Sequence, residues 1–126
     1  MELTAQRESI EKDHADIASI VAEIRRASDA QDFGLTRQLL LALQALEVEH
    51  YAREDALMRA TGVDMPARHR EEHAQLIDAL RSINQTIAVE GLRSISPRVA
   101  AHLEAALEHM HKSDLELWAI ISANSS

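Results

Sequence analysis

The segment LLLALQALEVEHYAREDALM, residues 39–58, carries most of the information about the fold. Its apolar side chains, beginning with Leu39 and Leu43, recur every three or four residues, which is the spacing of one face of an α-helix. His50 and Glu54 occupy the same face, at positions where apolar side chains would be expected. Because a charged group inside a protein must be paired or bound to a metal ion, this stretch predicts a helix that serves both a core and a polar site.

Glycine and proline residues divide the chain into four uninterrupted stretches. All three glycines and both prolines fall at residue 34, within 62–66 and within 91–97. Each stretch between them carries apolar residues at helical spacing. The expected helices are at about 3–29, 36–61, 66–89 and 97–122. Short connections make consecutive helices antiparallel neighbours, so the sequence predicts an all-α protein, an antiparallel up-down-up-down four-helix bundle that forms a single domain over the whole chain.

The composition narrows the class of protein. A chain of 126 residues that is 46% hydrophobic is long enough to bury a core. The absence of cysteine excludes disulfides, cysteine-ligated iron–sulfur clusters and thiolate zinc sites. A net charge of −8 argues against a nucleic-acid partner. No apolar run could cross a bilayer and the polar start MELTAQRESIEKD is not a signal peptide, so we expect a cytoplasmic protein without a membrane partner.

Five histidines and two carboxylates, spread over the four expected helices, form the candidate metal site. They are His14, His50, Glu54, His69, His73, His109 and Asp114. Counted from the expected turns at about 1.5 Å per residue, these positions fall in one slab of the bundle, with residue 109 roughly one turn away. The residues at 50 and 54, and those at 69 and 73, are four apart, so each pair can chelate from one helix face.

The spacing between His109 and Asp114 is less regular. Five residues correspond to about 140° around an ideal helix, which is awkward for two side chains that share a site. A local π-type widening of the helix would align them. We therefore expect such a distortion between these residues, or a wide angle of approach. His111 faces roughly away from His109 and is expected to be solvated.

Imidazole and carboxylate ligands without sulfur suit iron, manganese or zinc. Seven such ligands exceed what one octahedral ion accepts, whereas two ions bridged by Glu54 and Asp114 can use all of them. With a solvent-derived oxygen bridge, an ion that takes three histidines becomes six-coordinate. The other ion, with two histidines, is then five-coordinate and keeps one open position for a small ligand.

The order His14 … His50-x-x-x-Glu54 … His69-x-x-x-His73 … His109-x-x-x-x-Asp114 resembles that of the bacterial single-domain hemerythrins over nearly the whole chain. The resemblance implies a non-haem centre of two iron ions (Fe2+/Fe3+) with a bridging oxo or hydroxo group. It implies that three histidines hold one iron (His69, His73, His109), that two hold the other (His14, His50), and that Glu54 and Asp114 bridge the ions. The implied function is reversible O2 binding for storage, delivery or sensing.

The sequence indicates less clearly which ligand or reaction the open iron position serves. Many bacterial hemerythrins have Trp-Leu where this chain has Ala105 and Ala106, so we expect a wider pocket or a path to solvent. The alternative function is peroxidase or nitric oxide-handling activity at the same iron pair. No catalytic residue is assigned, because no general acid or nucleophile stands out near the site beyond Tyr51. The expected partner is O2 or another small ligand, and the expected assembly is a monomer or a weak homo-oligomer.

A second di-iron scheme also contains a motif that this chain matches. Ferritin-like carboxylate proteins use Glu-x-x-His on two helices and one glutamate from each of the other two. Glu11 with His14 and Glu47 with His50 match the short motif, but the later two helices offer histidines where that scheme needs glutamates. Glu11 and Glu47 are therefore expected at the surface or behind the metal ligands.

Overall fold

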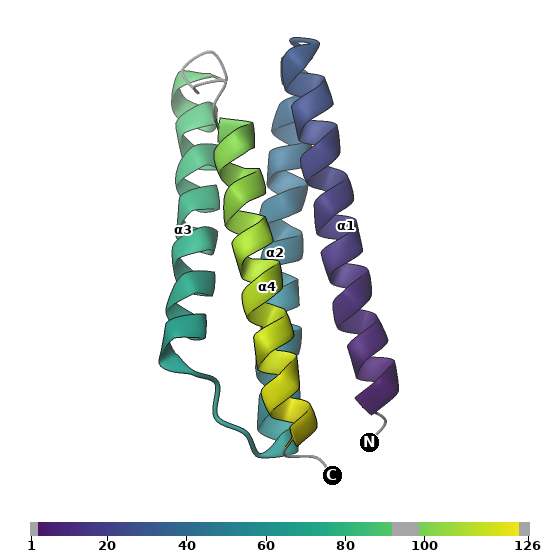
Figure 1. The fold of residues 1–126 in the computed structure, drawn as a ribbon. Coiled ribbons are helices and arrows are strands. Elements are labelled where there is room, and N and C mark those ends of the chain that lie inside the picture. The colour runs from purple at the N-terminus through teal and green to yellow at the C-terminus, as the bar shows by residue number, and fades with distance from the viewer. Residues whose placement is uncertain (1–2, 92–98, 124–126) are drawn as a thin grey trace.

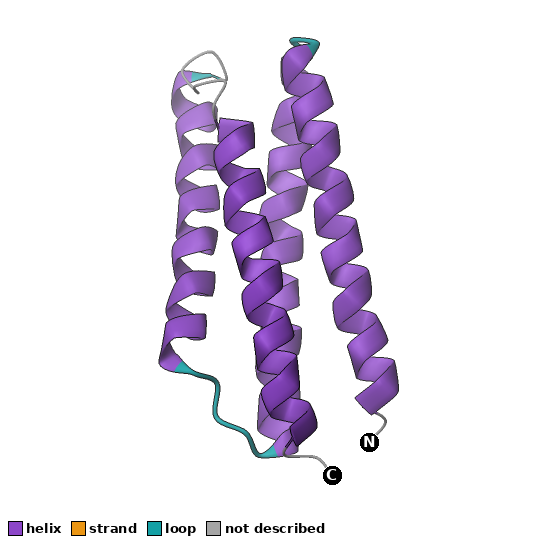
Figure 2. Cartoon of the chain, in the orientation of Figure 1, coloured by secondary structure: helices purple, strands orange, loops and turns teal. Residues whose placement is uncertain are grey.

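The computed structural model describes residues 3–91 and 99–123, which form four α-helices (Figures 1 and 2). They are α1 (Leu3–Asp29), α2 (Phe33–Thr61), α3 (Ala67–Glu90) and α4 (Val99–Ala123). The helices lie side by side along a common axis, and the described residues contain no strand. The predicted all-α four-helix bundle is confirmed. The expected start of the last helix, near residue 97, lies outside the described residues.

The ends of α2 show where local chemistry sets the helix boundaries. Asp32 caps the start: its side chain accepts a hydrogen bond from the Leu35 backbone N–H at 3.2 Å. This cap starts α2 three residues earlier than expected, and it places Gly34 inside the first turn instead of in a break. At the other end Gly62 adopts a left-handed φ of 71°, which a glycine takes without steric penalty. The predicted break at Gly62 is confirmed.

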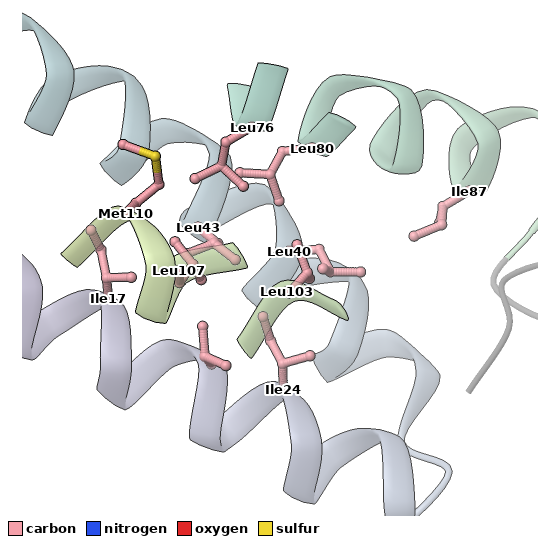
Figure 3. Close-up of a cluster of buried hydrophobic side chains, with 11 residues drawn as sticks. Ile17, Ile24, Leu40, Leu43, Leu76, Leu80, Ile87, Leu103, Leu107 and Met110 are labelled. Atoms are coloured by element: carbon pink, nitrogen blue, oxygen red, sulfur yellow. The ribbon is translucent and has the colours of Figure 1, made fainter. Parts of the chain in front are cut away.

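Two apolar clusters fill the interior of the bundle. The larger one is drawn in Figure 3 and takes side chains from all four helices: Ile17, Val21, Ile24, Leu40, Leu43, Leu76, Leu80, Ile87, Leu103, Leu107 and Met110. The smaller one consists of Ile10, Leu57, Met58, Met65, Leu117 and Ile121. Because these clusters use opposite ends of α1, α2 and α4, they leave a gap along the axis, and the buried polar residues occupy it.

The gap is visible in the order of residues along each helix. On α2 the sequence of buried side chains runs from Leu43 through His50 and Glu54 to Leu57. On α4 Asp114 lies between buried Met110 and Leu117 in the same way. Apolar packing above and below thus keeps a polar slab out of bulk water. None of the helices described here is long and apolar enough to cross a membrane.

Candidate metal centre

Six of the seven predicted ligands meet in the polar slab. They are His14 from α1, His50 and Glu54 from α2, His69 and His73 from α3, and Asp114 from α4. Their ligand atoms form two groups, each with all atoms within 4.8 Å of one another. One group, the His14–His50 half-site, and the other, the His69–His73 half-site, both include Glu54 and Asp114. The two carboxylates are thus shared by the two half-sites.

Asp114 divides its two oxygen atoms between the half-sites. Its Oδ2 atom lies 2.6 Å from His14 Nε2 and 2.9 Å from His50 Nε2. Its Oδ1 atom lies 3.0 Å from His69 Nε2 and 3.2 Å from His73 Nε2. With one oxygen turned to each pair of imidazoles, the carboxylate has the arrangement of a bridge.

Glu54 repeats this division from the other side of the slab. Its Oε1 atom lies 3.1 Å from His69 Nε2 and 2.9 Å from His73 Nε2. Its Oε2 atom lies 3.6 Å from His50 Nε2. The side chains of Glu54 and Asp114 are each only 2% exposed, so these contacts are made away from bulk solvent.

The buried carboxylates strongly change the acid–base behaviour of the histidines. Burial by itself would lower the pKa of His50, but the hydrogen bond to Asp114 and the charge of Glu54 outweigh it and raise the pKa to about 9. Burial is likewise outweighed by hydrogen bonds to carboxylates at His69, whose pKa rises to about 9, and at His73, whose pKa rises to about 11. Burial would raise the pKa of Asp114, but hydrogen bonds with four histidines hold it well below its usual range. The slab therefore stabilises positive charge.

Three of the histidines are held from behind through their Nδ1 atoms. His50 donates from Nδ1 to Asp13 at 3.1 Å, and Arg53 donates to both carboxylate oxygens of Asp13 at 2.8 and 2.6 Å. His69 Nδ1 shares a hydrogen bond of 2.8 Å with the Ser113 hydroxyl. His73 Nδ1 lies 3.2 Å from Glu47 Oε1. Partners of this kind fix the ring so that Nε2 points to the centre.

The sequence held a signal for one of these partners. Asp13 lies three residues after Ile10 and four before Ile17, so it continues the apolar stripe of α1 and should have been expected inside. Burial would raise the pKa of Asp13, but the hydrogen bonds from Arg53 and His50 outweigh it and lower the pKa. Ser113 carries no such pattern, because its role depends on the angle between α3 and α4.

His109 is the one predicted ligand that the structure does not bring to the cluster. Its side chain is 58% exposed, and its Nε2 atom lies 2.9 Å from Glu72 Oε2 on α3. The expected π-type widening is absent from α4, which runs as a regular α-helix through residues 109–114. On such a helix five residues turn by about 140°, so an inward Asp114 directs His109 outward and gives the inner position to Met110.

A cleft of about 280 Å³ adjoins the His14–His50 half-site, between α1 and α4. It reaches His14, His50 and Asp114, and its apolar walls come from Ile17, Ala18, Val21, Ala22, Leu107 and Met110. His111 is exposed, as expected, but its ring also packs at 4.1 Å from the His14 ring, beside the cleft.

The alanines singled out in the sequence do not line this cleft. Ala105 is exposed, and Ala106 lines a separate depression between α3 and α4 together with Ala79. The expected widening of the pocket through Ala105 and Ala106 is therefore wrong for this half-site, because neither residue lines the cleft. Small residues of α1, Ala18 and Ala22, open the cleft instead.

The arrangement of donor atoms fits metal ions. His69 Nε2 and His73 Nε2 lie 3.1 Å apart, and two imidazole nitrogens this close repel each other unless a proton or a cation lies between them. Each half-site offers two imidazole nitrogens and two carboxylate oxygens, without sulfur. This donor set suits first-row divalent ions such as iron, manganese and zinc.

Four helices around a buried cluster of histidines and carboxylates define a cation-binding helical bundle. The sequence model of the hemerythrin HHE cation-binding domain matches residues 6–121, and the chain belongs to this family. The predicted family is thereby confirmed for most of the chain. No curated protein and no solved structure matches the chain.

Proposed function

We propose that the slab holds two iron ions and that the protein binds O2 reversibly at this pair. The observation that carries the proposal is the division of Asp114, with one oxygen directed to His14 and His50 and the other to His69 and His73. Iron in such a site supplies the electrons that O2 takes up on binding and returns on release. We assign the metal-ligand roles to the six clustered residues, with Glu54 and Asp114 shared.

The residues of the slab and of its surroundings would set the charge of the metal pair and the access to it. Glu54 and Asp114 neutralise part of the charge of two cations, which lets the ions lie in a buried slab. The two apolar clusters exclude bulk water above and below it. The cleft between α1 and α4 gives a small apolar ligand a route to the His14–His50 half-site.

Optical spectra of the iron(II)-loaded protein test this function. We expect O2 to produce a visible absorption band that disappears when O2 is removed by exchange with argon, and that returns on readmission. A band that never forms, or that is not reversed by removing O2, would contradict reversible binding.

Peroxide or nitric oxide turnover is the second candidate. One observation favours it: the cleft is larger than O2 requires, and exposed residues such as Ala18 and His111 line it. A reactive ligand could then be replaced quickly by solvent. Rapid, repeated consumption of hydrogen peroxide by the iron-loaded protein, without a reversible O2 band, would favour this candidate over O2 binding.

We also propose that His109 becomes the seventh ligand, as the family resemblance implies. This requires α4 to widen by about one residue between His109 and Asp114, and it requires His109 to leave Glu72. We expect His109→Ala to lower the binding affinity for one of the two ions by more than the roughly 10- to 100-fold that the loss of a hydrogen-bond partner behind a ligand costs. The matched control is His102→Ala, which removes an exposed histidine of the same helix. Two ions bound with wild-type affinity in His109→Ala, measured by chelator competition, would show that six ligands suffice.

A further inference from the structure

We propose that Glu47 is a positioning residue, whose negative charge orients His73 and strengthens metal binding in the His69–His73 half-site. The inference rests on the proposed metal pair and assigns a role that the family pattern of seven ligands does not contain. The sequence left Glu47 either at the surface or behind the ligands. The structure resolves this, because the residue is only 1% exposed.

The contacts of Glu47 point to one neighbour. It lies on α2, one turn before His50, and its Oε1 atom is 3.2 Å from His73 Nδ1. This is the one ion pair of Glu47 among the residues that the structure describes. Neither of its buried oxygen atoms has a hydrogen-bond partner among the described residues, so its contact with His73 Nδ1 is an ion pair and not an aligned hydrogen bond. The carboxylate therefore faces the back of the His73 ring, while His73 Nε2 faces Glu54 and Asp114.

A comparison with the other outer partners shows what is unusual about this one. Behind His50, the charge of Asp13 is neutralised by two hydrogen bonds from Arg53, whose side chain is 39% exposed. Behind His69, the Ser113 hydroxyl carries no charge. Among the residues that the structure describes, Glu47 is the one of these three partners that is a buried carboxylate without an ion pair to arginine or lysine.

A buried carboxylate without such a partner is costly, and its ion pair with His73 offsets that cost only while the imidazole is protonated. A cation on the opposite side of His73 gives a further reason for the charge. An acceptor on Nδ1 fixes the tautomer that presents Nε2 to the ion, and a charged acceptor also makes the imidazole a stronger donor. The effect increases with the charge of the ion, so Glu47 should favour the oxidised over the reduced iron pair.

Two variants separate the charge of Glu47 from its packing. Glu47→Gln keeps an acceptor of the same length and removes the charge, and Glu47→Leu removes both. With Co2+ as the probe, in competition with a chromophoric chelator, we expect about a tenfold loss of affinity for the glutamine variant and up to about 100-fold for the leucine variant. The reduction potential of the iron-loaded glutamine variant should rise. Glu49→Gln, which removes a 65% exposed carboxylate from the same helix, should leave both properties unchanged.

The Co2+ affinity and the reduction potential provide the readout that a packing role would not change. Since Glu47 also pairs with His73 in the metal-free protein, we expect chelator-treated Glu47→Gln and Glu47→Leu to unfold below the wild-type temperature, which a packing role would predict as well. Lower thermal stability with unchanged Co2+ affinity and unchanged potential would overturn the inference in favour of a structural role. Wild-type protein that binds no Co2+ would contradict the proposed metal site as well. Wild-type binding of Co2+ that is equalled by both variants would contradict the role of Glu47 alone.

Discussion

Asp114→Asn is expected to lose both metal ions while the protein remains folded. Asparagine has the shape of aspartate but offers one acceptor oxygen, and its amide nitrogen cannot coordinate a cation. Because the two oxygens of Asp114 serve different half-sites, at least one half-site loses a ligand and the pair loses a bridge. The affinity for each ion should fall by more than the roughly 100-fold that removal of an outer partner can cost. Metal content after gel filtration measures the effect.

Folding must be followed in parallel. Helical circular dichroism of chelator-treated Asp114→Asn should match that of wild type, because both apolar clusters are untouched. Glu116→Gln is the control, since it removes an exposed carboxylate two residues further along α4. Asp114→Asn that is well folded and still holds two ions would remove Asp114 from the centre.

The second large effect is an opposite pH dependence of the metal-free and metal-loaded proteins. The pKa values of His50 and His69 are raised to about 9, and that of His73 to about 11, from an ordinary value of 6.5. A histidine whose pKa is raised by folding stabilises the folded state. This stabilisation is complete at pH values below the pKa in the unfolded state, and it is lost as the pH rises through the pKa in the folded state. The metal-free protein should therefore lose stability between about pH 6.5 and about pH 11, by several kcal/mol in total, since one pKa unit corresponds to about 1.36 kcal/mol.

Asp114 makes the stability of the metal-free protein depend on pH in the opposite direction at acidic pH. Its pKa is held well below the usual range, so its contribution is present above the unfolded value and is lost as the pH falls below it. The metal-loaded protein should behave differently at the alkaline side. Metal binding requires neutral imidazoles, so metal affinity rises with pH.

Urea denaturation at pH 6 and pH 9 compares the two forms. After chelator treatment, we expect the urea midpoint to be lower at pH 9 than at pH 6. With metal bound, we expect it to be higher at pH 9 or unchanged. Midpoints that move in the same direction in both forms would mean that His50, His69 and His73 are not charged in the metal-free protein or do not bind the metal.

Much of the fold followed from the sequence because its signals are local. Gly62 and the apolar stripe through Leu43 and Leu57 defined α2 without reference to other helices. The predicted start of the same helix is three residues too late, because Gly34 is typical of a break whereas Asp32 caps the helix before it. The hydrogen bond from the Leu35 N–H to the Asp32 side chain sets the boundary, and the helix accommodates Gly34 in its first turn.

The part of the site that could be predicted is the position of each ligand along its helix. Counting residues from the turns predicts one slab for all seven side chains, because helix rise is constant, and six of them lie there. His109 did not follow, since its inclusion needed a distortion that the regular α4 does not contain. Arg53 and Ser113 could not be anticipated, because their contacts depend on how the helices are rotated against one another.

The cleft shows the same limit. The sequence drew attention to Ala106 because the family usually has a larger residue there. The rotation of α4 that directs Asp114 inward places Ala106 toward α3 and leaves Ala18 and Ala22 of α1 beside His14. A pocket formed between helices depends on both partners, and a pattern on one helix does not determine it.

The most direct test of the central claim is the amount and state of bound iron. The protein should be loaded with iron(II) under argon, freed of excess metal, and analysed for iron per chain together with Mössbauer spectra after brief exposure to air. We predict two irons per chain, whose spectra after oxidation are those of an antiferromagnetically coupled pair. One iron per chain, or two irons that remain magnetically independent, would contradict a centre in which Glu54 and Asp114 bridge two ions.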